Sequence, residues 1–115
     1  MADVQVLSGL SCQQFINGQL IDGEGQQECI VNPANGETLI VLTEASSAQV
    51  GSAVKAAQQA FGHWSRTTPA QRAALLLRIA DAIERQAPQL AQLEALNCGK
   101  PLHQALNDDL PAAVD

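Results

Sequence analysis

The chain has 115 residues, which allows one domain at most and is long enough in principle to bury a core. Its formal net charge is −6, and all its Lys and Arg residues follow Ser46, so no basic groove is available for nucleic acid. No apolar run is long enough to span a membrane, and the N-terminus lacks the basic start of a signal peptide, so we expect a cytoplasmic protein.

Residues 1–14 predict a loose terminus, and residues 15–43 predict a small β region. Two short apolar runs within residues 15–21 flank Asn17 and Gly18. This pair favours a type I′ turn, in which both positions need a positive φ, so a β-hairpin is predicted here.

The rest of the β region predicts two turns and two strands. Residues 22–25 read Asp-Gly-Glu-Gly, and residues 32–37 contain Asn-Pro and Asn-Gly, compositions typical of turns. Residues 28–31 and 38–43 are short apolar stretches, which predict strands rather than helices.

Residues 46–115 predict a helical region, which starts with two helices that carry the same capping signal. Ser46 with Gln49, and Thr68 with Gln71, have the spacing of a capping box. Gly62 is predicted to end the first helix as a left-handed residue. Apolar residues then recur at helical spacing, as Val50, Ala53, Val54, Ala57 and Phe61 in the first helix and Leu75, Leu76, Ile79, Ala80 and Ile83 in the second.

A third helix is predicted to restart at Pro88 and to end at a left-handed Gly99. Residues 102–106 predict one further helical turn. Asp108 or Asp109 is predicted to cap a final helix, and the chain stops within its apolar pattern, so we expect a severed helix.

The helices need a surface to cover their apolar faces, and the chain offers little. It contains one Trp, two Phe and no Tyr. Because apolar area left in water costs about 25 cal/mol per Å², we expect the covering surface to lie outside these residues, with Trp64 as a core or interface anchor.

The cysteines do not indicate a disulfide framework or a zinc site. Cys12, Cys29 and Cys98 are odd in number and widely spaced, which suits a reducing compartment. Lys100 is a cationic neighbour for Cys98, but the negative end of the preceding helix opposes a thiolate there. We therefore expect a packed, structural thiol at this position.

No other catalytic constellation is present. His63 and His103 are isolated and are expected at the surface, since a metal site needs three or four ligands. No Gly-rich phosphate-binding motif occurs. From the residues alone, three interpretations remain open: an incomplete piece of an enzyme, a non-enzymatic helical interaction module, or a small redox protein using Cys98.

An ordered set of short motifs, from residue 15 to the end, resembles the N-terminal segment of the NAD(P)-dependent aldehyde dehydrogenase superfamily. The matching residues are Phe15-Ile16-Asn17-Gly18, Val31-Asn32-Pro33-Ala34-Asn35-Gly36-Glu37, Glu44-Ala45-Ser46, Ala56-Ala57-Gln58-Gln59-Ala60-Phe61 with Trp64, Arg72 with Leu75-Leu76-Leu77, and Leu93-Glu94 with Gly99-Lys100-Pro101.

The resemblance implies an α/β fold in which a short β-hairpin and strands precede three to five amphipathic helices. Residues 1–115 would form an incomplete N-terminal part of the cofactor-binding domain, divided into 1–14, 15–43 and 46–115. Partners would be the remainder of the enzyme chain and its subunits in a homo-oligomer.

In the family, a cysteine thiolate attacks an aldehyde, hydride passes to NAD, and a glutamate activates the hydrolytic water. The resemblance places those residues, and the ones that bind NAD, beyond residue 115. We therefore expect no catalytic residue and no cofactor-binding residue here, and a chain that is inactive alone and binds no NAD.

The resemblance also indicates a branch and a cation site. Residues 97–103 with residues 107–108 are similar to γ-aminobutyraldehyde (4-aminobutanal, 1-pyrroline) dehydrogenases of putrescine degradation, with betaine-aldehyde dehydrogenases as the alternative. Related enzymes hold a monovalent cation at the positions of Ile30, Val31 and Asn97, where this chain has Asn in place of the family's Asp.

Overall fold

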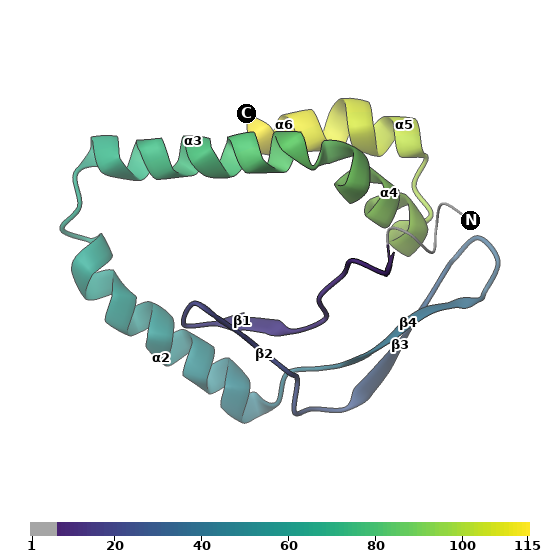
Figure 1. Ribbon diagram of the computed structural model, residues 1–115, viewed down its shortest axis with the longest axis horizontal. Coiled ribbons are helices and arrows are strands. Elements are labelled where there is room, and N and C mark those ends of the chain that lie inside the picture. Colours follow the sequence, from purple (N-terminus) through teal and green to yellow (C-terminus); the bar gives the residue numbers. More distant parts are fainter. Residues whose placement is uncertain (1–6) are drawn as a thin grey trace. The chain divides into compact units, whose positions relative to one another are not determined.

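The computed structural model describes residues 7–115, so the predicted loose terminus over residues 1–14 falls partly outside the described residues. The described chain forms two compact units. Figure 1 labels the helices and strands that they contain. Unit 1 contains residues 7–10, 31–39 and 68–115, and unit 2 contains residues 11–30 and 40–67.

The predicted hairpin is confirmed in unit 2. Strands β1 (Gln14–Ile16) and β2 (Gln19–Ile21) pair antiparallel, with Ile16 opposite Gln19. The two turn residues have positive φ angles, 52° at Asn17 and 77° at Gly18. This is the type I′ geometry that the Asn-Gly pair favours.

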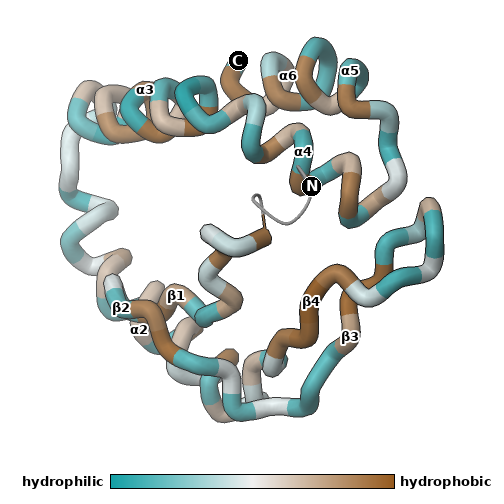
Figure 2. The backbone as a smooth tube through the Cα atoms, turned by 45° about the vertical axis from the view of Figure 1, so that its right-hand side comes forward, coloured by the Kyte–Doolittle hydropathy of each residue, from teal (hydrophilic) through white to brown (hydrophobic). Residues whose placement is uncertain are grey.

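Strands β3 (Gln27–Val31) and β4 (Thr38–Thr43) form a second two-stranded sheet, as predicted. Backbone hydrogen bonds close both of its ends, from the Asn32 N–H to the Glu37 carbonyl and from the Glu44 N–H to the Gln26 carbonyl. The apolar character of β4 is visible in Figure 2.

The prediction of a turn at residues 22–25 is wrong. The segment is an irregular connection with a bend at Gly25. A Cβ atom on Gly23 would lie 2.1 Å from the carbonyl oxygen of Thr43, so a glycine is required here because another backbone passes close by.

Helix α2 (Ser47–Trp64) begins with the predicted capping box, in which the Gln49 N–H donates to Ser46 Oγ at 3.2 Å. The predicted end at Gly62 is wrong, because the helix continues to Trp64 and closes at a right-handed Ser65. Nearby groups satisfy its last carbonyls without a left-handed residue: the Ser65 N–H donates to Phe61 O, and Arg66 Nε donates to Gly62 O.

Helices α3 (Pro69–Arg85) and α4 (Ala87–Cys98) follow the predicted signals. Thr68 and Gln71 form a capping box with Pro69 in the first turn. Gly99 ends α4 in the left-handed conformation, with φ 70°, and its N–H donates to Ala95 O at 3.0 Å.

The C-terminal helix is continuous, so the predicted break at Asp108 or Asp109 is wrong. Helix α5 (Leu102–Gln104) passes into a π-helical turn, η1 (Ala105–Asp109), and then into α6 (Leu110–Val114). Neither aspartate caps a helix through its side chain, and Asp109 has right-handed helical angles.

The core of the described chain is small. Its fully buried apolar residues are Ala91 and Ala105, both in unit 1 where α4 meets η1 and α6 packs on α3. Large apolar side chains on the predicted helix faces are instead exposed: Val50, Val54 and Phe61 on α2, and Leu75, Leu76 and Ile79 on α3. Leu77 of α3, outside the predicted face, is exposed as well. No helix among the described residues is long and apolar enough to cross a membrane.

Candidate functional site

The Asn-Pro turn after β3 lies against the end of α4 within unit 1. A Cβ atom on Gly99 would lie 3.0 Å from Cγ of Pro33, so the proline ring touches the glycine that ends the helix. Asn32 fixes the turn, because its side-chain oxygen accepts from the Ala34 N–H at 2.9 Å. The positive φ favours glycine at position 99, and the proline ring leaves little room for a Cβ atom there.

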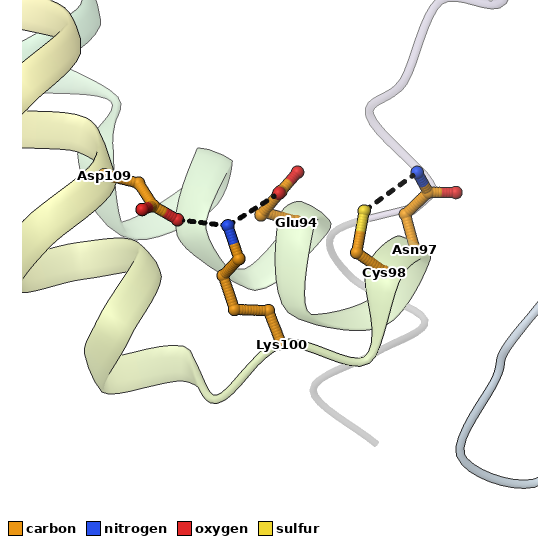
Figure 3. Close-up of polar contacts among 5 residues, drawn as sticks. All are labelled: Glu94, Asn97, Cys98, Lys100 and Asp109. Carbon is orange, nitrogen blue, oxygen red and sulfur yellow. Dashed lines mark hydrogen bonds and ion pairs between the residues drawn. The ribbon is translucent and has the colours of Figure 1, made fainter.

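Two of the three predicted cation residues belong to this unit. Val31 ends β3 directly before the Asn-Pro turn, and Asn97 lies in the last turn of α4, two residues before Gly99. Ile30 belongs to unit 2. Asn97 is exposed, and its side-chain amide donates to Cys98 Sγ at 3.8 Å (Figure 3).

The expectation of a packed thiol at Cys98 is wrong. Cys12, Cys29 and Cys98 are all exposed. The ammonium of Lys100, the cationic neighbour of Cys98 in the sequence, is paired with two carboxylates. The structure therefore offers no arrangement that favours Cys98 as a nucleophile.

Lys100 joins two acidic side chains from different elements of unit 1. Its Nζ forms an ion pair with Asp109 of η1 and a second one with Glu94 of α4, at 3.4 Å (Figure 3). The three side chains are only partly exposed, at 30% for Lys100, 43% for Glu94 and 41% for Asp109. This cluster connects the end of α4 to the C-terminal helix.

The hydrogen bond from Lys100 to Asp109 raises the pKa of the ammonium above its ordinary value of 10.5. Desolvation of the ammonium lowers that pKa, and the hydrogen bond to Glu94 raises it again. The lysine is thus held in its charged form. The sequence pattern gave no sign of this cluster, since Lys100 and Asp109 are nine residues apart and lie on different elements.

The remaining titratable residues form no recognisable centre. Among residues 7–115, no three His, Cys, Asp or Glu side chains lie close enough together to hold a metal ion. His63 and His103 are exposed, as expected. Trp64 is 38% exposed at the end of α2.

The sequence predicts Gln49 of unit 2 only as part of a capping box, and the structure gives its side chain a wider role. Gln49 is 7% exposed, and its side chain does more than complete the capping box. Its Oε1 accepts from the N–H groups of Glu24 at 2.9 Å and Ser46 at 3.0 Å, and its Nε2 donates to the carbonyl of Asp22 at 2.8 Å. The network is structural, because every buried side-chain polar atom in the described chain has a partner.

An open groove of about 570 Å³ runs along α3 in unit 1. Its lining combines apolar residues with two arginines and one aspartate, and it holds no pair of groups suited to acid–base or nucleophilic work. The lining residues are Leu75, Arg78, Ile79, Asp81, Ala82, Ile83, Arg85, Gln86 and Leu90.

Comparisons with known proteins agree with the resemblance in the sequence. The profile of the aldehyde dehydrogenase family matches residues 20–115. DhaS of Bacillus subtilis, whose name assigns it to the aldehyde dehydrogenases, is 42% identical over 104 residues, which are 88% of this chain and 21% of DhaS. Aminoacetaldehyde dehydrogenase of Pseudomonas aeruginosa is 38% identical over the same shares of the two chains.

A solved structure gives the same fold. Betaine aldehyde dehydrogenase of Staphylococcus aureus, in complex with NAD+, superposes with a TM-score of 0.91 at 30% identity, over 98% of this chain and 23% of that one. The chain spans about a fifth of the length of the curated relatives that it matches.

Proposed function

We propose, because this chain belongs to the aldehyde dehydrogenase family, that it serves as the N-terminal part of the cofactor-binding domain of an NAD-dependent aldehyde dehydrogenase. In this role residues 1–115 contribute structure and no catalytic or NAD-binding side chain. The reaction would belong to the longer protein, whose partners would be its remaining segments and its subunits in a homo-oligomer of the cytoplasm.

The observation that carries this proposal is the exposed apolar surface of α2 and α3. Val54 is 63% exposed, Phe61 is 64% exposed and Leu76 is 62% exposed. Side chains of this size are usually covered in a folded protein, and on each of the two helices they recur at helical spacing, so each apolar face is suited to an interface. Relatives of this chain are about four times as long, which is enough chain to provide that cover.

For the substrate, we propose an aminoaldehyde such as 4-aminobutanal, oxidised to the acid. Support comes from the residues that resemble the aminobutyraldehyde branch and from the aminoacetaldehyde dehydrogenase among the relatives. A betaine-aldehyde substrate is the second candidate, favoured by the close structural match to betaine aldehyde dehydrogenase.

We also propose that Ile30, Val31 and Asn97 contribute ligands for a monovalent cation. Backbone carbonyls and an amide oxygen are hard ligands that suit such an ion. The C-terminal end of α4 carries a partial negative charge and has no basic residue in its last turn. These residues supply fewer than the roughly six oxygens that hard cations take, so water or further residues must complete the set.

The cation proposal is tested in the protein expressed from its own gene, including the codons that follow residue 115. Potassium chloride should raise its unfolding temperature more than choline chloride does at equal ionic strength. Asn97→Asp should enlarge the difference, because a carboxylate adds charge to the site. Equal effects of the two salts on both proteins would contradict the proposal.

A chimaera tests the structural role. Residues 20–115 replace the matching segment of the P. aeruginosa aminoacetaldehyde dehydrogenase, and the same enzyme without that segment is the control. The chimaera should fold and form NADH from aminoacetaldehyde, whereas the control should not. An insoluble chimaera would show that these residues do not fit an aldehyde dehydrogenase.

Two further assays test the activity. The 115-residue chain alone should form no NADH with 4-aminobutanal, and turnover above background would overturn the structural role. The protein expressed from its own gene, with the codons that follow residue 115, should prefer 4-aminobutanal to betaine aldehyde by about tenfold in kcat/KM. The reverse preference would favour the betaine-aldehyde alternative.

A further inference from the structure

The π turn η1 interrupts an otherwise α-helical C-terminal segment. The Leu110 N–H donates to the carbonyl of Ala105, five residues earlier, where an α-helix would use Leu106. Such turns are rare and are less favourable than α-helix, so a specific interaction must hold this one.

Two features of unit 1 bear on the π turn. Pro111 lies just after it, and a proline inside a helix has no N–H to donate and crowds the carbonyl four residues earlier, here that of Asn107. Asp109, the last residue of the turn, is paired with Lys100 on the segment before α5. The proline weakens the α register without excluding it, and the ion pair between Lys100 and Asp109 selects the π register.

The position of Asp109 depends on the extra residue of the turn. Each residue of an α-helix advances the chain by about 100°. If η1 relaxed to α-helix, Asp109 would rotate by roughly that amount relative to α5, and its carboxylate would leave Lys100. The ion pair and the π turn are therefore linked: loss of the ion pair allows η1 to relax to α-helix, and relaxation of η1 breaks the ion pair.

We propose that Lys100, through its ion pairs with Asp109 and Glu94, is a clamp that holds η1 in the π conformation and thereby sets the rotation of α6. In the clamped state Leu110 and Val114 are the half-buried residues of α6, while residues 111–113 are exposed. Helix α6 packs on α3 in this orientation. The inference concerns the backbone and does not depend on the proposed enzyme activity.

The test detects the hydrogen bond of η1 directly. Through-bond NMR couplings between an amide nitrogen and the carbonyl carbon that accepts its proton identify the acceptor. In the 115-residue chain, Leu110 N should couple to the carbonyl of Ala105. In Lys100→Met, the coupling should move to Leu106, whereas Lys100→Arg should retain the coupling to Ala105.

Two more variants distinguish the effect of the Lys100 ion pairs on the η1 hydrogen bond from the effects of Pro111 and of net charge. Pro111→Ala should keep the coupling to Ala105, because the ion pair remains. Asp108→Asn removes a charge from the exposed neighbour of Asp109 and should change nothing. The proposal is overturned if Lys100→Met keeps the π coupling, or if Pro111→Ala loses it while the ion pair is intact. Alanine suits a helix, so Pro111→Ala should fold and remains an informative test even where Lys100→Met fails to fold.

Discussion

At the scale of a single residue, the side chain of Gln49 joins the start of α2 to the connection that follows β2. Its bond with Ser46 was predictable, because a capping box depends only on a spacing of three residues. Its bonds to Asp22 and Glu24 span 25 or more residues and require the connection after β2 to pass beside α2. No local pattern in the sequence predicts that this connection lies beside α2.

Replacing Gln49 measures how much its hydrogen bonds contribute to the free energy of unfolding. Gln49→Ala should lower the free energy of unfolding by about 1–3 kcal/mol, since it leaves buried N–H and C=O groups without partners. Urea unfolding followed by circular dichroism measures the change. Gln58→Ala, at an exposed position on the same helix, is the matched control and should stay within about 0.5 kcal/mol of the parent. Equal losses in the two variants would show that the network contributes nothing beyond helix propensity.

At the scale of elements, the starts of helices were predicted better than their ends. Both capping boxes and the restart at Pro88 are local chemistry and were confirmed. Gly62 failed as a terminus because the residues after Trp64 satisfy the last carbonyls of α2 in another way. The π turn was not predictable, since it depends on an ion pair with Lys100 across nine residues.

Alanine substitutions at two glycines should have opposite effects. Gly62 lies inside α2 with open space around its Cα, so Gly62→Ala should raise stability by up to about 0.5–1 kcal/mol. Gly99 has φ 70° and touches Pro33, so Gly99→Ala should cost about 1–2 kcal/mol. Chemical denaturation of the two variants under the same conditions checks both signs. A stabilising Gly99→Ala would contradict the left-handed cap.

The Lys100 ion pairs, which join α4 to η1, predict that the stability of the fold depends on pH. The pKa of Lys100 is raised in the folded chain above 10.5, so the pairs stabilise the fold below that pH. As pH rises through the raised pKa, the ammonium loses its proton and this stabilisation disappears. The stability difference between the parent and Lys100→Met should therefore be constant from neutral pH up to the ordinary pKa and shrink above it.

Urea unfolding at a series of pH values measures that difference. Lys55→Met, at an exposed lysine on α2, is the control and should show no such decline. A difference between the parent and Lys100→Met that persists undiminished at the highest pH would mean that the lysine acts through packing of its alkyl chain and not through its charge.

At the scale of the whole molecule, composition and motif order predicted the exposed helix faces and the family, which the chemistry of single residues did not. The scarcity of aromatic residues indicated that the helix faces lacked cover, and the structure leaves those faces exposed. The ordered motifs indicated the aldehyde dehydrogenase family, which the comparisons confirm. The substrate could not be predicted with the same force, because relatives named for different aldehydes, aminoacetaldehyde and betaine aldehyde, both match this chain.

The exposed surface of α3 should behave differently in the isolated chain and in a longer enzyme. Leu76 and Leu77 are 62% and 66% exposed. In the 115-residue chain, Leu76→Gln with Leu77→Gln should reduce the fluorescence of a dye that binds apolar surface. The same change should leave the unfolding free energy within about 0.5 kcal/mol, since little buried area is lost. In the chimaeric dehydrogenase, where we expect these leucines to be covered, it should cost about 2–5 kcal/mol or abolish soluble expression. If both proteins tolerate the change equally, the surface of α3 meets water in the enzyme as well, and the apolar cover inferred for it does not exist.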